Sequence, residues 1–241
     1  MFQYIFVVVP AVFAGLVQGV TGFGAGILLM MFYPFCFQML QSSAMSQLLC
    51  AVLCISIVWR YRHFVRLQIC VLPLVFYFPV YFAAIRMAMK LNMDSLKPVL
   101  GIFLIVLAVY FIVGAGKIQI TAGIWSALVC AALAAIIDAF FGIGGPTIVI
   151  YFMAILKEKQ EYLGTIQTFF MITSLYGTAV RILSGQLSSD LFLPLAAGAA
   201  ALLLGARAGS RIVERIDIAK MKLLVYGLIG AAGLITFLSG M

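Results

Sequence analysis

Long apolar stretches separated by short charged loops run through the chain from one end to the other. Continuous apolar runs occupy 98–116, 122–156 and 223–238, and a shorter one occupies 191–206. Runs of about 18 or more apolar residues are typical of membrane-spanning helices. The pattern therefore predicts an all-α polytopic membrane protein. The ordinary helices expected from it lie at 44–59, 67–86, 98–116, 163–181, 191–209 and 222–239.

Two apolar segments, the run at 122–156 and another at 4–35, are interrupted by closely spaced glycines. A straight helix over 4–35 would be about 48 Å long, whereas the hydrocarbon core of a bilayer is about 30 Å thick. Glycine in a helix interior costs about 1 kcal/mol relative to alanine, so the glycines mark a break in each segment. Each is predicted to be a hairpin of two shorter helices that turns inside the membrane. The second helices should begin near Ala25 and Pro146, because proline suits the first turn of a helix.

Each glycine-broken segment begins one of two related halves of the chain. We predict two transmembrane repeats of about 120 residues, 1–120 and 121–241, each a hairpin followed by three helices. At an offset of 120 residues, Gln18 corresponds to Asp138 and Gln47 corresponds to Gln167. Further matches at this offset are Ala11, Ala14, Gly22, Gly24 and Phe32 with Ala131, Ala134, Gly142, Gly144 and Phe152.

The cationic residues favour a second repeat that is inverted in the membrane. Lys and Arg are enriched in cytoplasmic loops. The loop at 60–66 carries three of them and its counterpart at 181–190 carries one, whereas 86–97 carries three and 207–222 carries five. Equivalent loops of unequal charge are expected if they lie on opposite sides of the membrane. The inverted arrangement predicts that both termini lie outside; a parallel arrangement of eight spans is the alternative.

Composition excludes several classes of protein. The chain is 66% hydrophobic and 9% charged, with a mean hydropathy of +1.22, which leaves no segment for a soluble domain. Its net charge of +8 lies in short loops, so no nucleic-acid partner is expected. The five cysteines form no CxxC pair and there is one histidine, so neither a metal site nor a cofactor is expected. The sequence contains no arrangement of nucleophile and base, so an enzyme is not expected.

The two breaks suggest a binding site for an anion. Helix N-termini carry unpaired N–H groups and a partial positive charge, and two of them would meet near the membrane midplane. Glycines let a ligand approach the backbone closely. The candidate substrate-binding residues are Gly22, Gly24, Gly142, Gly144 and Gly145 through their backbone, and Thr21, Thr147, Gln47 and Gln167 through their side chains.

Asp138 is the only acid deep in an apolar segment, and ionisable residues there are usually functional. It is a candidate proton-coupling residue; alternatively it is neutral and bonded to backbone at the break. Gln47 and Gln167 either contact the ligand or bond across helices. Arg181, near a helix end, is interpreted as snorkelling to the interface. Arg86 and Arg207 are also expected to be interfacial.

Small residues recur every four positions late in the chain and predict close helix packing. This face could pack within one chain or form a homodimer. Its members are Ala197, Ala201, Gly205 and Gly209.

Three stretches resemble the sulfite exporter TauE/SafE family of bacterial membrane transporters. They are GLVQGVTGFGAGILL (15–29), its second copy DAFFGIGGPTIVIYF (138–152) and the late GARAGSRI (205–212). The resemblance covers nearly the whole chain. It implies an inner-membrane protein that transports, and often exports, sulfite, sulfonates or other small organic anions.

The resulting hypothesis is a secondary transporter, expected to be an exporter, of a small anion, with alternating access to a midplane site between the glycine breaks. Its partners would be a small anionic substrate and the lipid bilayer. An anion channel and a non-transporting membrane scaffold are the alternatives.

Overall fold

The computed structural model describes residues 2–91, 97–109 and 123–212, together with five residues near the C-terminus. Every regular element in these residues is a helix, as the hydrophobic pattern predicts. Most of the helix expected at 222–239 lies outside the described residues. Five described helices are long and apolar enough to cross a membrane: Met39–Phe64, Leu67–Ala88, Ile124–Phe141, Lys159–Leu183 and Phe192–Arg211. The protein is therefore a multi-pass membrane protein.

The order of helices in the first part of the chain repeats in the second. In the first part these are α1 (Phe2–Thr21), α2 (Ala25–Phe32), α3 (Met39–Tyr61), α4 (Leu67–Ala88) and α5 (Lys97–Val109). In the second part they are α6 (Ile124–Phe141), α7 (Gly145–Ile155), α8 (Lys159–Leu183) and α9 (Phe192–Ile212). Short 3₁₀ turns follow α2 and α3 and precede α9.

Both glycine-rich segments are interrupted where their glycines lie. Gly22 ends α1 with a φ of +81° and Gly142 ends α6 with a φ of +65°, a left-handed conformation that residues with a Cβ rarely adopt. The next helices begin at Ala25 and at Gly145. The Tyr33 hydroxyl, just after α2, donates to the Val7 carbonyl near the start of α1. Thus α2 runs back along α1.

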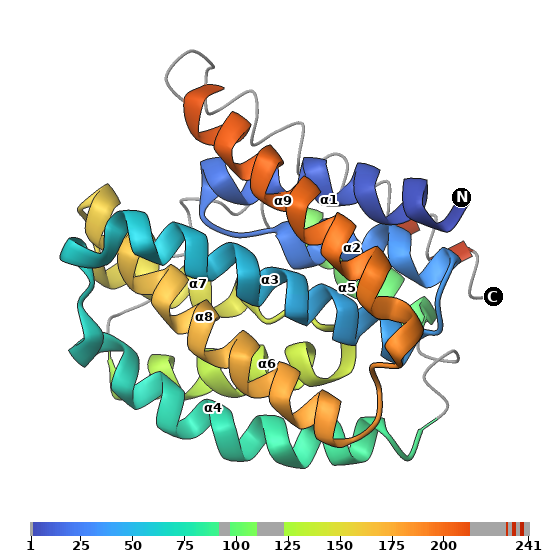
Figure 1. Ribbon diagram of the computed structural model, residues 1–241. Coiled ribbons are helices and arrows are strands. Elements are labelled where there is room, and N and C mark those ends of the chain that lie inside the picture. Colours follow the sequence, from blue (N-terminus) through green and yellow to red (C-terminus); the bar gives the residue numbers. More distant parts are fainter. Residues whose placement is uncertain are drawn as a thin grey trace.

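At the centre of the molecule, α3 and α8 lie side by side and run in opposite directions (Figure 1). At one end, the backbone N–H of Arg66, just after α3, donates to Thr165 Oγ1 near the start of α8. At the other end, Arg181 near the end of α8 donates to Ser43 Oγ near the start of α3. These two helices correspond to each other at the offset of 120 residues, so the related parts of the chain meet in antiparallel fashion.

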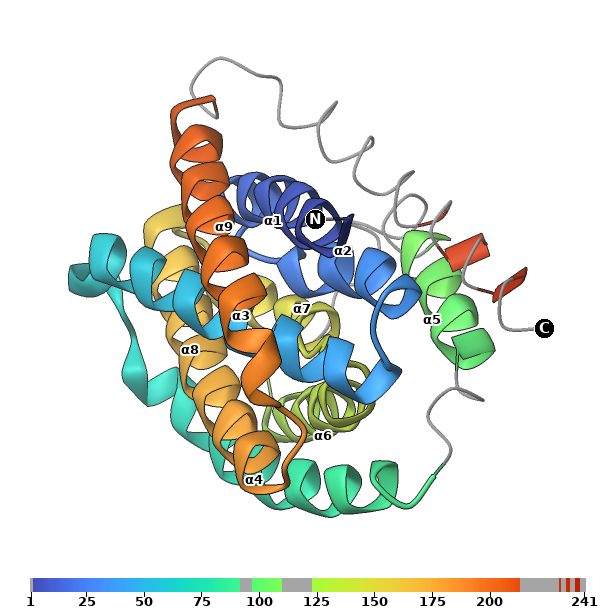
Figure 2. The same cartoon turned by 45° about the vertical axis from the view of Figure 1, so that its right-hand side comes forward.

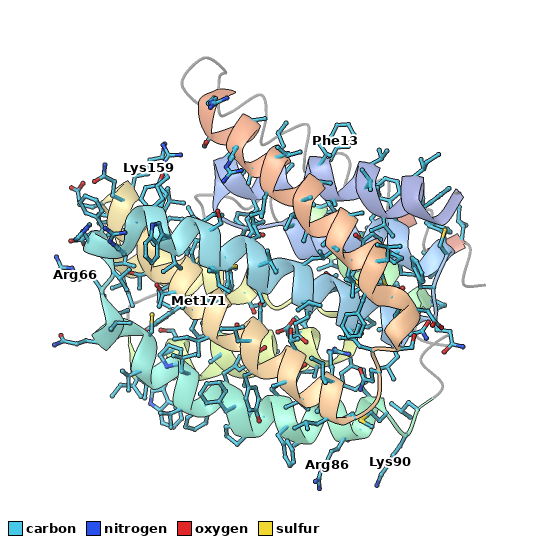
Figure 3. The ribbon with its side chains drawn as sticks, in the orientation of Figure 1. Phe13, Arg66, Arg86, Lys90, Lys159 and Met171 are labelled. Carbon is cyan, nitrogen blue, oxygen red and sulfur yellow. The ribbon has the colours of Figure 1, made fainter. Side chains whose placement is uncertain are left out.

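The remaining contacts also come in matched pairs on either side of α3 and α8 (Figure 2). Helix α1 packs on α9, and its counterpart α6 packs on α4. Helix α5 lies against the described C-terminal residues, since Gly101 is in close contact with Phe237. Large apolar side chains such as Phe13, 59% exposed, point outwards (Figure 3), as they must where lipid surrounds a protein.

The small-residue face of α9 packs within the chain, against α1. A Cβ added to Gly205 would overlap the carbonyl oxygen of Val12, and one added to Gly209 would lie 2.5 Å from that of Leu16. Glycines of α1 make the reciprocal approach, because a Cβ on Gly19 would lie 2.8 Å from the Ala206 carbonyl oxygen. This face is therefore occupied by α1 rather than free for a second copy of the chain.

We predict that Gly205→Ala lowers the stability of the purified protein. Its methyl group would meet backbone, which cannot move without separating α1 from α9, and overpacking of this kind costs about 1–3 kcal/mol. The control is Gly198→Ala in the same helix, whose methyl group would meet the side chains of Val7 and Leu49 instead. Thermal unfolding in detergent should show the larger loss for Gly205→Ala; equal midpoints would contradict the close packing.

Candidate functional site

A small, partly open cavity lies where the two helix breaks meet. Its volume is about 40 Å³, counted over the positions open to the centre of a water molecule. One water needs about 10–15 Å³ on this measure, so the space suits a few waters or one ion of a few heavy atoms. The breaks touch each other beside it, since a Cβ on Gly26 would lie 2.9 Å from the Gly142 carbonyl oxygen. The lining includes Gln18, Phe23, Gly24, Gly26, Gln47, Cys50, Cys54, Asp138, Gly142, Gly144, Gly145, Pro146, Phe170 and Thr173.

On the side of the first break, two buried glutamines hold the backbone. Gln18 Oε1 accepts from the N–H of Ala25, the first residue of α2, at 3.2 Å. Gln167 Nε2 donates to the carbonyl of Gly22, at the end of α1, at 2.8 Å. The amides also bond to each other, Gln18 Nε2 to Gln167 Oε1 at 3.2 Å. The glutamine pair thus supplies partners for a helix end and for a helix start.

On the side of the second break, the buried carboxylate of Asp138 takes the corresponding place. Its Oδ2 accepts from Gln47 Nε2 at 2.9 Å and from the hydroxyl of Tyr77. The backbone N–H of Gly144, just before α7, is also bonded to it. Asp138 therefore lies at the N-terminus of α7, where the partial positive charge of a helix favours an anion.

The two polar pairs occupy positions that correspond in the sequence. At the offset of 120 residues, Gln18 and Gln167 correspond to Asp138 and Gln47, so each pair joins one residue from each half of the chain. Only the second pair contains a charge.

Arg181 is buried within this cluster, and the expectation that it snorkels to the interface is wrong. Its side chain is fully buried, and Nη2 donates to the carbonyl oxygens of Asp138 and Ala139 at 3.2 and 2.8 Å. These carbonyls belong to the last turn of α6: that of Asp138 also accepts from the backbone N–H of Gly142, whereas Arg181 is the partner of that of Ala139. The guanidinium is thus a cap for a helix that ends inside the protein. Arg86, by contrast, is exposed and lies over the ring of Phe82.

The remaining donors of Arg181 also go to neutral acceptors. Nε donates to Gln47 Oε1 at 2.7 Å, and Nη1 donates to Ser43 and to Gln186, each at 2.8 Å. The Tyr81 hydroxyl also lies 3.2 Å from Nε. Gln47 therefore bridges the two charges, with its oxygen towards Arg181 and its nitrogen towards Asp138. Among the described residues, Asp138 and Arg181 are the only charged side chains that are buried.

The cavity brings together part of the predicted site. Gly24, Gly142, Gly144, Gly145 and Gln47 line it, as does Asp138. Gln167 bonds across helices as described above, and Gly22 presents its carbonyl to it.

The two predicted threonines are used locally instead. The Thr21 hydroxyl lies 2.7 Å from the Phe23 carbonyl oxygen and 2.9 Å from that of Val17. The Thr147 hydroxyl donates to the Cys130 carbonyl at 3.3 Å. Neither lines the cavity: Thr21 bonds to backbone at the first break, whereas Thr147 joins the first turn of α7 to the first half of α6.

Several members of the cluster were not predicted from the sequence. Tyr77 and Tyr81 stack on each other at 5.6 Å and place both hydroxyls beside the Gln47 bridge. Their spacing of four residues inside an apolar helix is the one signal that could have indicated a shared polar neighbour. The buried Ser46 hydroxyl was not predicted either, and its neighbour is the Cys50 thiol, which lines the cavity.

The described residues contain no group of three or more His, Cys, Asp or Glu side chains that could hold a metal ion. Comparison with protein-family models gives a match over residues 7–236, to the family described as Sulfite exporter TauE/SafE. Searches of the curated proteins and of the solved structures give no match.

We predict that Arg181→Gln destabilises the protein strongly. It leaves the end of α6 without its donors and Asp138 without its countercharge, and removing one partner of a buried pair costs about 3–5 kcal/mol. The control is Arg207→Gln, which removes an exposed guanidinium of α9 and should change stability by less than about 0.5 kcal/mol. Denaturant unfolding in detergent measures both; similar values for the two variants would contradict a capping role for Arg181.

Proposed function

Since the chain belongs to the sulfite exporter TauE/SafE family of membrane transporters, we propose that it is a secondary transporter of a small anion such as sulfite or a sulfonate. The anion would bind in the cavity between the two helix breaks, and exposure of this cavity would alternate between the two sides of the membrane. The observation that carries the proposal is that both breaks, 120 residues apart in sequence, line one small polar cavity. Broken helices that meet inside the membrane are the usual substrate site of secondary transporters.

The chemistry of the cavity supports an anion of a few heavy atoms. It is lined by the starts of α2 and α7, where the partial positive charge of a helix favours an anion; the N–H groups of Ala25 and Gly144 are bonded to Gln18 and Asp138.

Within this site we assign ligand contact to the lining residues Gly24, Gly142, Gly144, Gly145 and Gln47. Asp138, which shares the cavity, is the candidate proton-coupling residue. The other predicted residues, Gly22, Gln167, Thr21 and Thr147, contribute by fixing the backbone of the breaks.

We further propose that the two halves of the chain form an inverted repeat across the membrane. The antiparallel contact between α3 and α8, which correspond to each other, supports this arrangement. Two copies related by an axis in the membrane plane can exchange their conformations, which makes the site accessible from either side in turn.

The end of the molecule that carries Arg66 and Lys159 would face the cytoplasm (Figure 3). Arg66 bonds to Glu161 there, joining the loop after α3 to the start of α8. Arg86 and Lys90 lie at the opposite end and would face outwards, as would both termini of the chain. The positive-inside rule and the family support this placement in a bacterial inner membrane.

We predict that the purified protein, reconstituted in liposomes, carries at least one anion of a panel comprising sulfite, thiosulfate, sulfoacetate, methanesulfonate, taurine, acetate and chloride. Gly144→Ala should abolish this flux without preventing membrane insertion. A Cβ there would lie 2.9 Å from Cβ and Cγ of Asp138, so the carboxylate would be displaced from the start of α7. Tracer uptake measures the flux.

The control for Gly144→Ala is Gly198→Ala, an equally tight glycine that does not line the cavity and should retain transport. Normal uptake by Gly144→Ala would contradict the assignment of the site. Loss of all anion flux in the wild-type protein would favour a scaffold. Flux above roughly 10⁶ ions per second, without coupling to a second gradient, would favour a channel.

For the orientation we predict that a membrane-impermeant amine reagent added to intact cells modifies Lys90 but not Lys159. Both side chains are exposed and lie at opposite ends of the molecule (Figure 3). Mass spectrometry of the peptides measures the modification, and permeabilised membranes, in which both lysines should react, provide the control. Modification of Lys159 in intact cells would contradict the proposed orientation.

A further inference from the structure

The two buried charges restrict which forms of the protein can change conformation in the membrane. Asp138 and Arg181 are 5% and 0% exposed, and no other charged side chain among the described residues is buried. A net charge in a medium of low dielectric constant is strongly disfavoured, whereas a balanced pair is tolerated. Arginine remains protonated in proteins, so only Asp138 can change the balance by taking up a proton.

The net charge of the site in each of its forms decides whether the protein in that form can change conformation in the membrane. With the site empty, ionised Asp138 balances Arg181. With a monovalent anion bound, the balance returns only if Asp138 is protonated, because the anion then replaces its charge. An anion beside ionised Asp138 leaves one excess negative charge, and protonated Asp138 without an anion leaves one excess positive charge.

The position of Asp138 in the cavity also requires that its carboxylate be protonated when an anion is bound. It lines the cavity and is bonded to the N–H of Gly144 at the start of α7, which is where an anion would be attracted. Two anionic groups sharing one small site cannot both be ionised at low cost. Protonation of the carboxylate is therefore required before an anion binds beside it.

We propose that the protein is an obligatory symporter of one proton with one small monovalent anion, and that Asp138 carries the proton while Arg181 provides the fixed countercharge. This deepens the proposed function and rests on it. A divalent anion with one proton would leave an excess negative charge, so hydrogen sulfite or a simple sulfonate fits and doubly charged sulfite or thiosulfate does not. Because proton and anion carry opposite charges, the coupled step moves no net charge across the membrane.

The surroundings of Asp138 allow this titration. From α3 it faces Gln47 and the Cys50 thiol, and from α4 the hydroxyls of Tyr77 and Tyr81. From α8 the nearest charge is Arg181, which bonds to the carbonyl of Asp138 rather than to its carboxylate. Since the carboxylate is held by neutral donors and not by a direct ion pair, it can take up a proton without breaking the cap on α6.

The test uses wild-type protein in liposomes and radiolabelled methanesulfonate, whose single charge does not change with pH. We expect uptake to be driven by an inward proton gradient and to be unaffected by a membrane potential set with potassium and valinomycin. An internal pH dye should record about one proton per methanesulfonate. Methanesulfonate binding, followed by thermal shift, should weaken about tenfold per pH unit on the alkaline side of the Asp138 titration.

Asp138→Asn separates coupling from binding. In this variant the empty site carries the uncompensated charge of Arg181 and cannot reorient, whereas the site with methanesulfonate bound is balanced. Exchange of internal for external methanesulfonate should therefore stay within about threefold of wild type, while net uptake should fall at least about tenfold. Glu158→Gln, which neutralises an exposed carboxylate between α7 and α8, should leave both rates unchanged.

The experiments distinguish failure of the proposed transport function from failure of the proposed proton symport. Absence of flux for every anion of the panel would overturn the transport function itself. Methanesulfonate uptake that follows the membrane potential and moves no protons would overturn symport alone. So would faster uptake of thiosulfate than of methanesulfonate, or an Asp138→Asn variant that binds methanesulfonate but does not exchange it.

Discussion

A helix that ends inside a membrane protein leaves backbone groups that no water can satisfy, and this constraint governs the centre of the structure. Four helix ends meet there: those of α1 and α6 and the starts of α2 and α7. Each is bonded to a buried side chain from a residue in the last turn of the preceding helix or from α8. The polar cluster is therefore needed by the fold before any ligand is considered, and it is the reason that the cavity beside it is polar.

The buried side chains that bond to the four helix ends come in corresponding pairs, but the two pairs differ in charge. Around the first break, Gln18 and Gln167 satisfy the backbone without charge. Around the second, Asp138 and Arg181 do so with opposite charges, bridged by Gln47. At the offset of 120 residues Arg181 corresponds to Tyr61. With the one inserted residue that aligns Pro73 with Pro194, Tyr77 corresponds to Gly198. One half of the chain therefore contributes the only carboxyl group among the residues that line the cavity.

Close helix packing holds this cluster in place from outside. The glycines of α1 and α9 allow these helices to touch along their backbones, and α6 packs on α4 in the matching position. Gly177 of α8 leaves room for the side chain of Gln47, because a Cβ there would overlap the Gln47 amide. The rigid contacts lie around the cluster and the breaks lie within it, which is the distribution expected if the breaks are the part that rearranges.

The sequence by itself determined the helical class, five apolar helices of the described residues that are long enough to cross a membrane and the position of both breaks, because hydrophobic length and glycine placement are local properties of the chain. It also identified Gln47, Gln167 and Asp138, since polar residues in apolar helices are conspicuous. What each of them bonds to was decided by the tertiary structure. Arg181 shows the reason. Near a helix end, it has the pattern of an interfacial arginine, and only the antiparallel packing of α8 on α3 carries its guanidinium to the carbonyls that end α6. Contacts between residues more than 40 positions apart leave no periodic trace in a sequence.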